Sequence, residues 1–243
     1  MRIDFIGVGF GRSGSKWLAN CLYEHPEISI PKFNLHTEIN YFPEEYEVMG
    51  LKNYMKKFLN CNFEKKVGEL STLIIWDKKS AKLLKMLFPN VKIIIYRRDE
   101  KERVRSTRNV AYNYDLVNDA SISKNLLHEI NQEKYIEPWI KEFGKNNVFV
   151  YDFEKSDKDK QKELNKLFRF LGVSEFTPPS IGIRKNSDYV DKERKQVRTV
   201  RYPIIRKIIN KIKIKLKSNK KLYYTLKRNF HFDYLFQLVN HNL

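Results

Sequence analysis

A glycine-rich segment that directly follows a short apolar run constrains the fold of this chain more than any other feature. The apolar run covers residues 3–8, and the segment GFGRSGSKWL covers residues 9–18. The glycines end a predicted strand, and a helix is expected over residues 15–24, up to His25 and Pro26. Flexible backbone N–H groups, the hydroxyls of Ser13 and Ser15 and the positive end of a helix then meet in one loop, which suits a phosphate-like group.

Short β-branched runs alternate with amphipathic segments along the rest of the first 175 residues or so. We expect further strands over residues 91–96 and 147–151, and helices over residues 77–88, from about 99, over 135–143 and over 157–171. This alternation is typical of an α/β fold with three layers, in which a mainly parallel sheet has helices on both faces. The loop after the first strand is then a P-loop-like phosphate-binding loop, and ligands are expected at the carboxyl ends of the strands.

The length of 243 residues allows one substantial core and an appendage. We predict a catalytic domain over residues 1–190 and a basic, partly amphipathic helical C-terminal extension over residues 191–243. The two cysteines, Cys21 and Cys61, both lie in apolar surroundings, which excludes a disulfide framework and favours a reducing compartment. Neither a signal peptide nor a membrane span is expected, so the predicted location is cytoplasmic.

Most of the positive charge belongs to the C-terminal extension. Residues 192–228 contain fifteen Lys or Arg and one acid, a net charge of +14 out of +18 for the whole chain. From Pro203 onward, isoleucines fall on one helical face: Ile204, Ile205, Ile208, Ile209 and Ile212. This segment is expected to pack on the domain as a helix, to lie at the surface of an anionic membrane or to bind an anionic polymer. Nucleic acid is not favoured as a partner, because no nucleic-acid fold signature is present.

The residue order in the first loop separates several kinds of phosphate site. A P-loop kinase needs Gly-x4-Gly-Lys-Ser/Thr, whereas Gly14 is followed here by Ser15 and Lys16 in the reversed order. The dinucleotide pattern G-x-G-x-x-G also matches, at Gly9, Gly11 and Gly14. A tight turn that binds no ligand is the third interpretation.

A second polar segment, IIIYRRDEKERVRSTR at residues 93–108, follows the predicted strand 91–96. Arg98 at the strand end and Ser106 two helical turns later can converge on one phosphate. Alternatively, Asp99 and Glu102 form a capping box at an exposed helix start. Both interpretations can hold together, because the cap orders the same turn.

Together these segments resemble the sulfotransferase family, and their motifs are closest to the carbohydrate and heparan-sulfate type. The pattern G-x-G-R-S-G-S-x-W-L resembles the family's 5'-phosphosulfate segment, and residues 93–108 resemble its 3'-phosphate segment. The resemblance implies 3'-phosphoadenosine 5'-phosphosulfate (PAPS) as donor, no metal and a hydroxyl acceptor, with a glycan or glycolipid favoured. The implied donor-binding residues are Gly11, Arg12, Ser13, Gly14, Ser15, Lys16, Arg98 and Ser106, with Arg184 and Lys185 in a late basic loop.

The resemblance also implies catalytic residues. The segment HTEINYF at residues 36–42 is similar to the family's K-E-x-H-F-F, which places the base at Glu38, with His36 as the second candidate. A base is needed because an alcohol is a poor nucleophile at neutral pH. Arg12 and Lys16 would stabilise charge on the sulfuryl group and its leaving phosphate. In VGELST, residues 67–72, Glu69 matches the family's G-E-K-[ST]-P and Leu70 stands in place of a lysine.

Two other classes of function remain open at this stage. One is a nucleoside or small-molecule kinase of the P-loop class, against which the position of Lys16 counts. The other is a basic adaptor that binds a membrane or a polyanion through residues 192–228, and it would leave both phosphate motifs unexplained.

Overall fold

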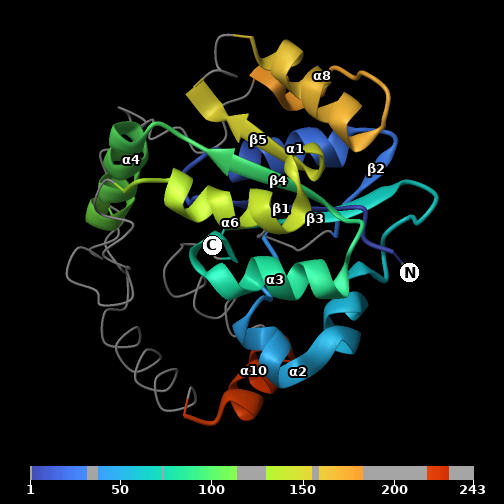
Figure 1. Ribbon diagram of the computed structural model, residues 1–243, viewed down its shortest axis with the longest axis vertical. Helices are drawn as coiled ribbons and strands as arrows, with labels where there is room; N and C mark the ends of the chain where they lie inside the picture. The colour runs from blue at the N-terminus through green and yellow to red at the C-terminus, as the bar shows by residue number, and fades with distance from the viewer. Residues whose placement is uncertain are drawn as a thin grey trace.

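The computed structural model describes residues 2–31, 38–72, 74–113, 130–154, 159–182 and 218–229. These residues contain a sheet of five strands in the order β2-β3-β1-β4-β5, and every adjacent pair is parallel (Figure 1). The strands are β1 (Phe5–Gly9), β2 (Ile28–Ser29), β3 (Lys66–Ser71), β4 (Lys92–Arg97) and β5 (Val148–Asp152). The predicted α/β class with a mainly parallel sheet is therefore confirmed.

Helices cover both faces of this sheet. The α-helices are α1 (Ser15–Glu24), α2 (Glu44–Met55), α3 (Lys78–Leu87), α4 (Glu100–Asn113), α6 (Glu133–Phe143), α8 (Lys160–Leu171) and α10 (Lys220–Asn229). Short 3-10 helices are η1 (Lys56–Phe58), η2 (Ile74–Trp76), η3 (Lys145–Asn147) and η4 (Pro179–Gly182). Helices α1 and α8 pack on one face, and α3 and α6 pack on the other (Figure 1).

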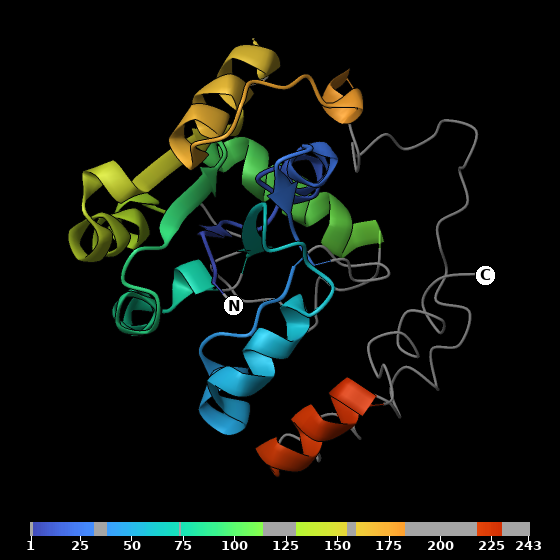
Figure 2. The same cartoon turned by 90° about the vertical axis from the view of Figure 1, so that its right-hand side faces the viewer.

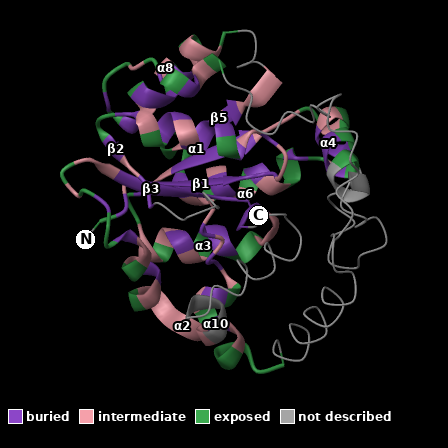
Figure 3. Ribbon diagram, turned by 180° about the vertical axis from the view of Figure 1, so that it is seen from behind, coloured by how far each residue is buried: buried purple, intermediate pink, exposed green. Residues whose placement is uncertain are grey.

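The two cores follow from the period of two in the central strands. In β4, Ile93 and Ile95 face the core shared with α3 and α6, whereas Ile94 and Tyr96 face the core shared with α1 and α8. Because both faces are covered, the central strands consist almost entirely of buried residues (Figure 3). This accounts for the continuous apolar runs in the sequence.

A close approach at Gly9 links the three central strands at their carboxyl ends. The Tyr96 ring of β4 lies over Gly9 of β1, and its hydroxyl donates a hydrogen bond to the backbone oxygen of Ser71 at the end of β3. A Cβ on Gly9 would lie 2.3 Å from Cδ2 of Tyr96 and 2.5 Å from its backbone oxygen. Only glycine at this position therefore lets the Tyr96 side chain reach across β1.

The observed elements lie close to the predicted ones. The strands expected over residues 3–8, 91–96 and 147–151 are β1, β4 and β5, displaced by one or two residues, and the helices over 15–24, 77–88 and 135–143 are α1, α3 and α6. For the helix over 157–171, α8 begins at Lys160, and residues 155–158 lie outside the described part. Periodicity does not predict β2, β3 or α2. Strand β2 has only two residues, β3 carries Gly68 and Glu69 in its middle, and α2 contains Gly50 in a non-helical conformation.

Part of the C-terminal extension lies against the first half of the chain. Helix α10 lies beside α2, where the Tyr224 hydroxyl donates a hydrogen bond of 3.0 Å to Oε2 of Glu44 (Figure 2). The helix expected from Pro203 lies outside the described residues. None of the described helices combines the length and the apolar character that crossing a membrane requires.

Candidate active site

The predicted phosphate loop lies at the carboxyl end of β1 and runs directly into α1. Gly14 precedes α1 in a left-handed conformation, with φ 82°, and a Cβ there would lie 2.3 Å from the Phe153 ring. Glycine is required on both counts. Because Gly14 has no side chain, it cannot cap the helix, and the first turn of α1 contains no acidic residue. The first N–H groups of α1 and the positive end of its dipole are therefore available to an anion.

Ser13 shows that the loop suits a group with many acceptor oxygens. Its side chain is buried, and its hydroxyl has no hydrogen-bond partner within the described residues. A buried hydroxyl without a partner is costly unless a ligand satisfies it. Phosphate and sulfate oxygens are such partners, so the residues present fit a 5'-phosphosulfate.

The second predicted segment meets the first at Arg12. Arg12 has a left-handed backbone with φ 69°, and its Nε donates a 3.0 Å hydrogen bond to Oγ of Ser106 in α4. The Arg98 guanidinium donates a 3.4 Å hydrogen bond to the backbone oxygen of Arg12. Three of the residues proposed from two separate motifs therefore lie together, although 94 positions separate Arg12 from Ser106.

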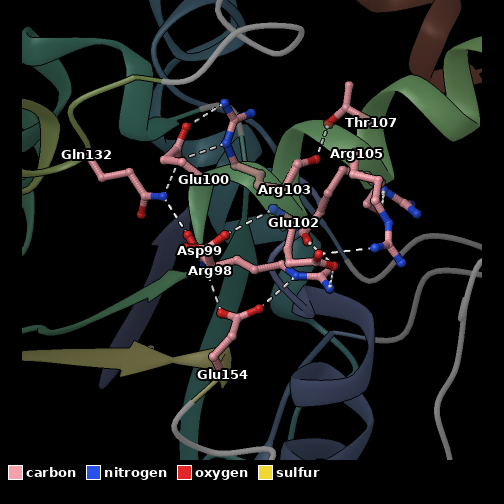
Figure 4. A network of polar contacts seen from close by, with 11 residues as sticks. Arg98, Asp99, Glu100, Glu102, Arg103, Arg105, Thr107, Gln132 and Glu154 are labelled. Atoms are coloured by element: carbon pink, nitrogen blue, oxygen red, sulfur yellow. Dashed lines mark hydrogen bonds and ion pairs between the residues drawn. The ribbon is translucent and has the colours of Figure 1, made fainter.

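Arg98 contacts two carboxylates that the sequence analysis did not pair with it, those of Glu102 and Glu154 (Figure 4). Its Nε lies 3.0 Å from Oε1 of Glu154, and one terminal nitrogen lies 3.4 Å from Oε2 of Glu102. The other Glu154 oxygen accepts the Asp99 N–H at 2.8 Å. Glu154 therefore fixes the turn between β4 and α4, and a bound phosphate would compete with it for Arg98.

The capping box at the start of α4 is only half formed. Asp99 accepts the Glu102 N–H at 3.1 Å, as predicted for the N-cap residue. The reciprocal bond is replaced, because the Glu102 side chain turns to the cations Arg98 and Arg105, and Glu154 takes the Asp99 N–H.

A buried ion pair supports the same turn from behind (Figure 4). Arg103 is fully buried and donates to both carboxylate oxygens of Glu100 at 2.9 Å. Glu100 also accepts from the Ile130 N–H and from Gln132, whose amide donates in turn to the backbone oxygen of Arg98. The network holds α4 against the start of α6, and thereby the backbone from which Arg98 projects.

Glu38 lies at the same edge of the sheet, with its backbone bridged to Leu70 of β3. Its carboxylate accepts hydrogen bonds from Oγ of Ser15 at 2.9 Å, from Oγ1 of Thr72 at 2.6 Å and from Nδ2 of Asn40 at 3.2 Å. Ser15 is the first residue of α1, so the predicted base contacts the phosphate loop directly. A partly buried carboxylate with three donors is suited to orient a hydroxyl next to a bound anion.

Some predicted site residues do not meet this group. Lys16 is exposed on α1, and its side chain has no hydrogen bond or ion pair within the described residues; Gly11 is half-buried in the loop. His36, Arg184 and Lys185 lie outside the described residues. The site residues that sequence reasoning missed are Asn40, Ser71, Thr72 and Glu154. Of these, Asn40 carries a local signal, since it stands next to the predicted base and adopts a left-handed φ of 46°.

Behind Glu38 lies a second, deeply buried carboxyl group, that of Glu69. Its Oε2 accepts the Ser71 hydroxyl at 2.7 Å, and its Oε1 accepts the Tyr54 hydroxyl at 3.4 Å. The pKa of Glu69 is raised from 4.5 to about 8, chiefly because the carboxyl group is buried. The hydrogen bonds from Ser71 and Tyr54 and the charge of Lys57 oppose this rise, and the charge of Glu38 adds to it. Glu69 is therefore mostly neutral at pH 7.

These features define an α/β protein with an anion-binding loop, convergent arginines and a carboxylate at the carboxyl edge of its sheet. A family model described as the sulfotransferase domain matches residues 2–223. The chain therefore belongs to the sulfotransferase family, and it is an enzyme that transfers a sulfuryl group. The family predicted from the two phosphate motifs is confirmed.

Solved structures agree at the level of the fold. A sulfotransferase from Alicyclobacillus acidocaldarius is 21% identical, with a TM-score of 0.53 over 93% of this chain and 96% of that one. A sulfotransferase domain from the curacin biosynthetic pathway is 16% identical, with a TM-score of 0.53 over 74% of this chain and 77% of that one. The sulfotransferase domain of the Synechococcus PCC 7002 olefin synthase is 15% identical, with a TM-score of 0.53 over 79% and 81%. No curated protein sequence matches the chain significantly.

The buried carboxyl group predicts a pH-dependent stability. Between the ordinary pKa of 4.5 and the folded value of about 8, the unfolded chain is ionised at Glu69 while the native chain still holds the proton. Raising the pH through this window therefore lowers the free energy of unfolding, by up to about 1.4 kcal/mol per pH unit, and the loss is complete above the folded pKa. Glu69→Gln should remove this decline, which urea unfolding at several pH values measures.

Glu24→Gln is the matched control for this measurement. Glu24 accepts the Ser180 N–H at the far end of α1, and its replacement leaves Glu69 intact, so the decline should persist. The same decline in Glu69→Gln as in the native chain would contradict the assignment.

Proposed function

We propose that the chain transfers the sulfuryl group of PAPS to a hydroxyl acceptor, with Glu38 as the base. The observation that supports this most is the hydrogen bond between Ser15 and Glu38. It joins a loop that can bind an anion to a carboxylate that can accept a proton. A reaction that attacks a bound sulfuryl group with a hydroxyl needs these two groups side by side.

The first loop would hold the 5'-phosphosulfate. The Ser13 hydroxyl and the first N–H groups of α1 offer uncharged donors, and Arg12 adds a positive charge. Arg98 and Ser106 lie against Arg12 and would hold the 3'-phosphate, for which the Arg98 fork must turn from Glu102 and Glu154. Arg184 and Lys185 are proposed to close over the same phosphate.

Glu38 would take the proton of the acceptor hydroxyl. Its hydrogen bonds to Ser15, Thr72 and Asn40 hold the carboxylate in one orientation, so that the remaining lone pair, on Oε1, can face the acceptor. His36 remains the second candidate for the base.

The transfer step exchanges one bond to sulfur for another. The acceptor oxygen forms a bond to sulfur while the bond between sulfur and the bridging oxygen of the 5'-phosphate breaks, and the acceptor proton passes to Glu38. Bound PAPS supplies an activated sulfuryl group with a phosphate leaving group. Negative charge then grows on the bridging oxygen, where Arg12 and the N-terminus of α1 can stabilise it.

A P-loop kinase is disfavoured by the described site. In a P-loop kinase, a lysine directly before the Ser or Thr reaches the nucleotide phosphates. Here Lys16 follows Ser15 instead, and its side chain is exposed. The strand end at β4 carries Arg97 and Arg98, where a magnesium site would need a carboxylate. Within the described residues, no group of three or more His, Cys, Asp or Glu is placed to hold a metal ion.

The acceptor class that we propose is a glycan or glycolipid hydroxyl. Its support is the resemblance of residues 36–42 to the base segment of carbohydrate sulfotransferases. Leu70 stands where that group commonly carries a lysine that binds substrate, so an uncharged sugar is favoured over a uronic acid.

Arg98→Ala should weaken binding of adenosine 3',5'-bisphosphate by about 10- to 100-fold, because a hydrogen bond to a charged group contributes about 1.5–3 kcal/mol. Isothermal titration calorimetry measures this loss. Arg105→Ala is the matched control, since Arg105 also pairs with Glu102 but its side chain is 73% exposed. Unchanged affinity in Arg98→Ala would refute the 3'-phosphate assignment, and a preference for ATP with magnesium would refute the donor.

Glu38→Gln should lower kcat for sulfuryl transfer by about 100-fold or more, because general-base catalysis contributes about 10²–10⁴-fold. The glutamine oxygen can still accept from Thr72 and Asn40, and its amide can donate to the Ser15 hydroxyl, so calorimetric affinity for the bisphosphate should stay within about twofold of the native value. Turnover close to the native rate would transfer the role of base to His36 or another group.

Incubation with PAPS labelled with ³⁵S and a panel of hydroxyl compounds tests the acceptor class. Neutral glycans and glycolipids should become labelled faster than uronic-acid glycans, phenols and steroid alcohols. Labelling confined to phenols or steroids would refute the carbohydrate assignment and leave sulfuryl transfer itself intact.

A further inference from the structure

A chain of hydrogen bonds leads inward from the predicted base to Glu69. Asn40 donates from its side chain to Glu38 and from its backbone N–H to Oγ of Ser71, at 3.2 and 2.9 Å. The Ser71 hydroxyl donates in turn to Oε2 of Glu69 at 2.7 Å. Each step uses a different donor, so the path from Glu38 to Glu69 is continuous.

The backbone around this chain is held on several sides. Asn40 accepts the Thr72 N–H at 2.9 Å, and Thr72 donates its own hydroxyl to Glu38. The Ser71 backbone oxygen accepts the Tyr96 hydroxyl. Asn40 has a left-handed φ of 46°, a conformation that asparagine enters more readily than most other residues, and its contacts hold it there. The bond to Ser71 is one of the contacts that fix it.

Glu69 is too deeply buried to contact an acceptor substrate. It is 1% exposed and lies on the same face of β3 as Ser71, two residues away, towards Tyr54 of α2. Among the described residues, the charged and titratable groups around it are Glu38, Tyr54, Tyr96 and Lys57, and Lys57 also pairs with Glu45 at 3.4 Å. Burying a carboxyl group this deeply is costly, and the hydrogen bonds from Ser71 and Tyr54 offset part of that cost.

We propose that Glu69 is a positioning residue for sulfuryl transfer, which acts through Ser71 and Asn40 to hold the base Glu38 against the phosphate loop. The inference rests on the proposed function, because it assigns a role relative to Glu38. Glu69 stays neutral at physiological pH, so it orders Ser71 without placing a second negative charge next to Glu38 and the anionic donor.

The proposal predicts an effect of pH that a purely structural residue would not produce. As the pH rises through about 8, Glu69 ionises and adds a buried negative charge behind Glu38. Binding of the anionic donor and transfer should then both weaken, so kcat/KM of the native enzyme should fall over this range. Glu69→Gln keeps an acceptor for Ser71 but cannot ionise, so its turnover at pH 7 should stay near native and the alkaline fall should disappear.

Ser71→Ala and Glu69→Leu test the path itself. Each removes one link, and the displaced Glu38 should lower kcat by about 10- to 100-fold, the effect expected of a displacement of about 1 Å. Affinity for adenosine 3',5'-bisphosphate should change by less than about twofold in both variants, because the donor contacts are intact. Ser71→Ala retains the Glu69 carboxyl group, so it remains informative if Glu69→Leu does not fold.

The assay uses ³⁵S-labelled PAPS with the acceptor that gives the highest rate in the panel, and Glu24→Gln serves as the control that keeps the alkaline fall. The inference is overturned if Glu69→Gln retains that fall, or if Ser71→Ala turns over at the native rate while Glu38→Gln is inactive. If Glu38→Gln itself is fully active, it is the assignment of the base in the proposed function that is wrong.

Discussion

The close approach between Tyr96 and Gly9 is the contact on which the site depends. Because Gly9 has no side chain, the Tyr96 ring crosses β1 and its hydroxyl reaches the backbone of Ser71. This joins the carboxyl ends of β3, β1 and β4 into one edge. The phosphate loop, the Glu38 segment and the start of α4 all attach at that edge, so their side chains meet although they lie far apart in the sequence.

Charge is distributed unevenly over this edge. The side proposed for the donor combines Arg12 and Arg98 with the N-terminus of α1, and the side proposed for the acceptor presents Glu38. Glu102 and Glu154 hold Arg98 in the described structure, and Glu100 neutralises the buried Arg103 behind it. An anionic donor would meet a site whose cations are already ordered, which lowers the cost of arranging them when it binds.

Much of the fold follows from the sequence, because local patterns carry it. The glycine loop, the β-branched runs and the amphipathic helices predict β1, β4, β5 and the helices that cover them. Elements without a strong local period were missed: β2 is two residues long, β3 carries Gly68 and Glu69 in its middle, and α2 is interrupted at Gly50. In the site, Arg12, Arg98 and Ser106 were predicted to bind one ligand and do meet, whereas the contact between Arg98 and Glu154, 56 positions apart, left no pattern in the sequence.

The sequence by itself determined the phosphate loop, the class of fold and the residue types available for sulfuryl transfer, because each depends on neighbours within a few positions along the chain. Only the tertiary structure decided that Ser15 and Thr72 bind Glu38, and that Glu69 lies buried behind them. Those contacts depend on which strands pair and in which register, and on how deeply the packing of α2 covers β3. The sequence alone does not distinguish a strand carboxyl group that is neutral in a core from one that is charged at a surface.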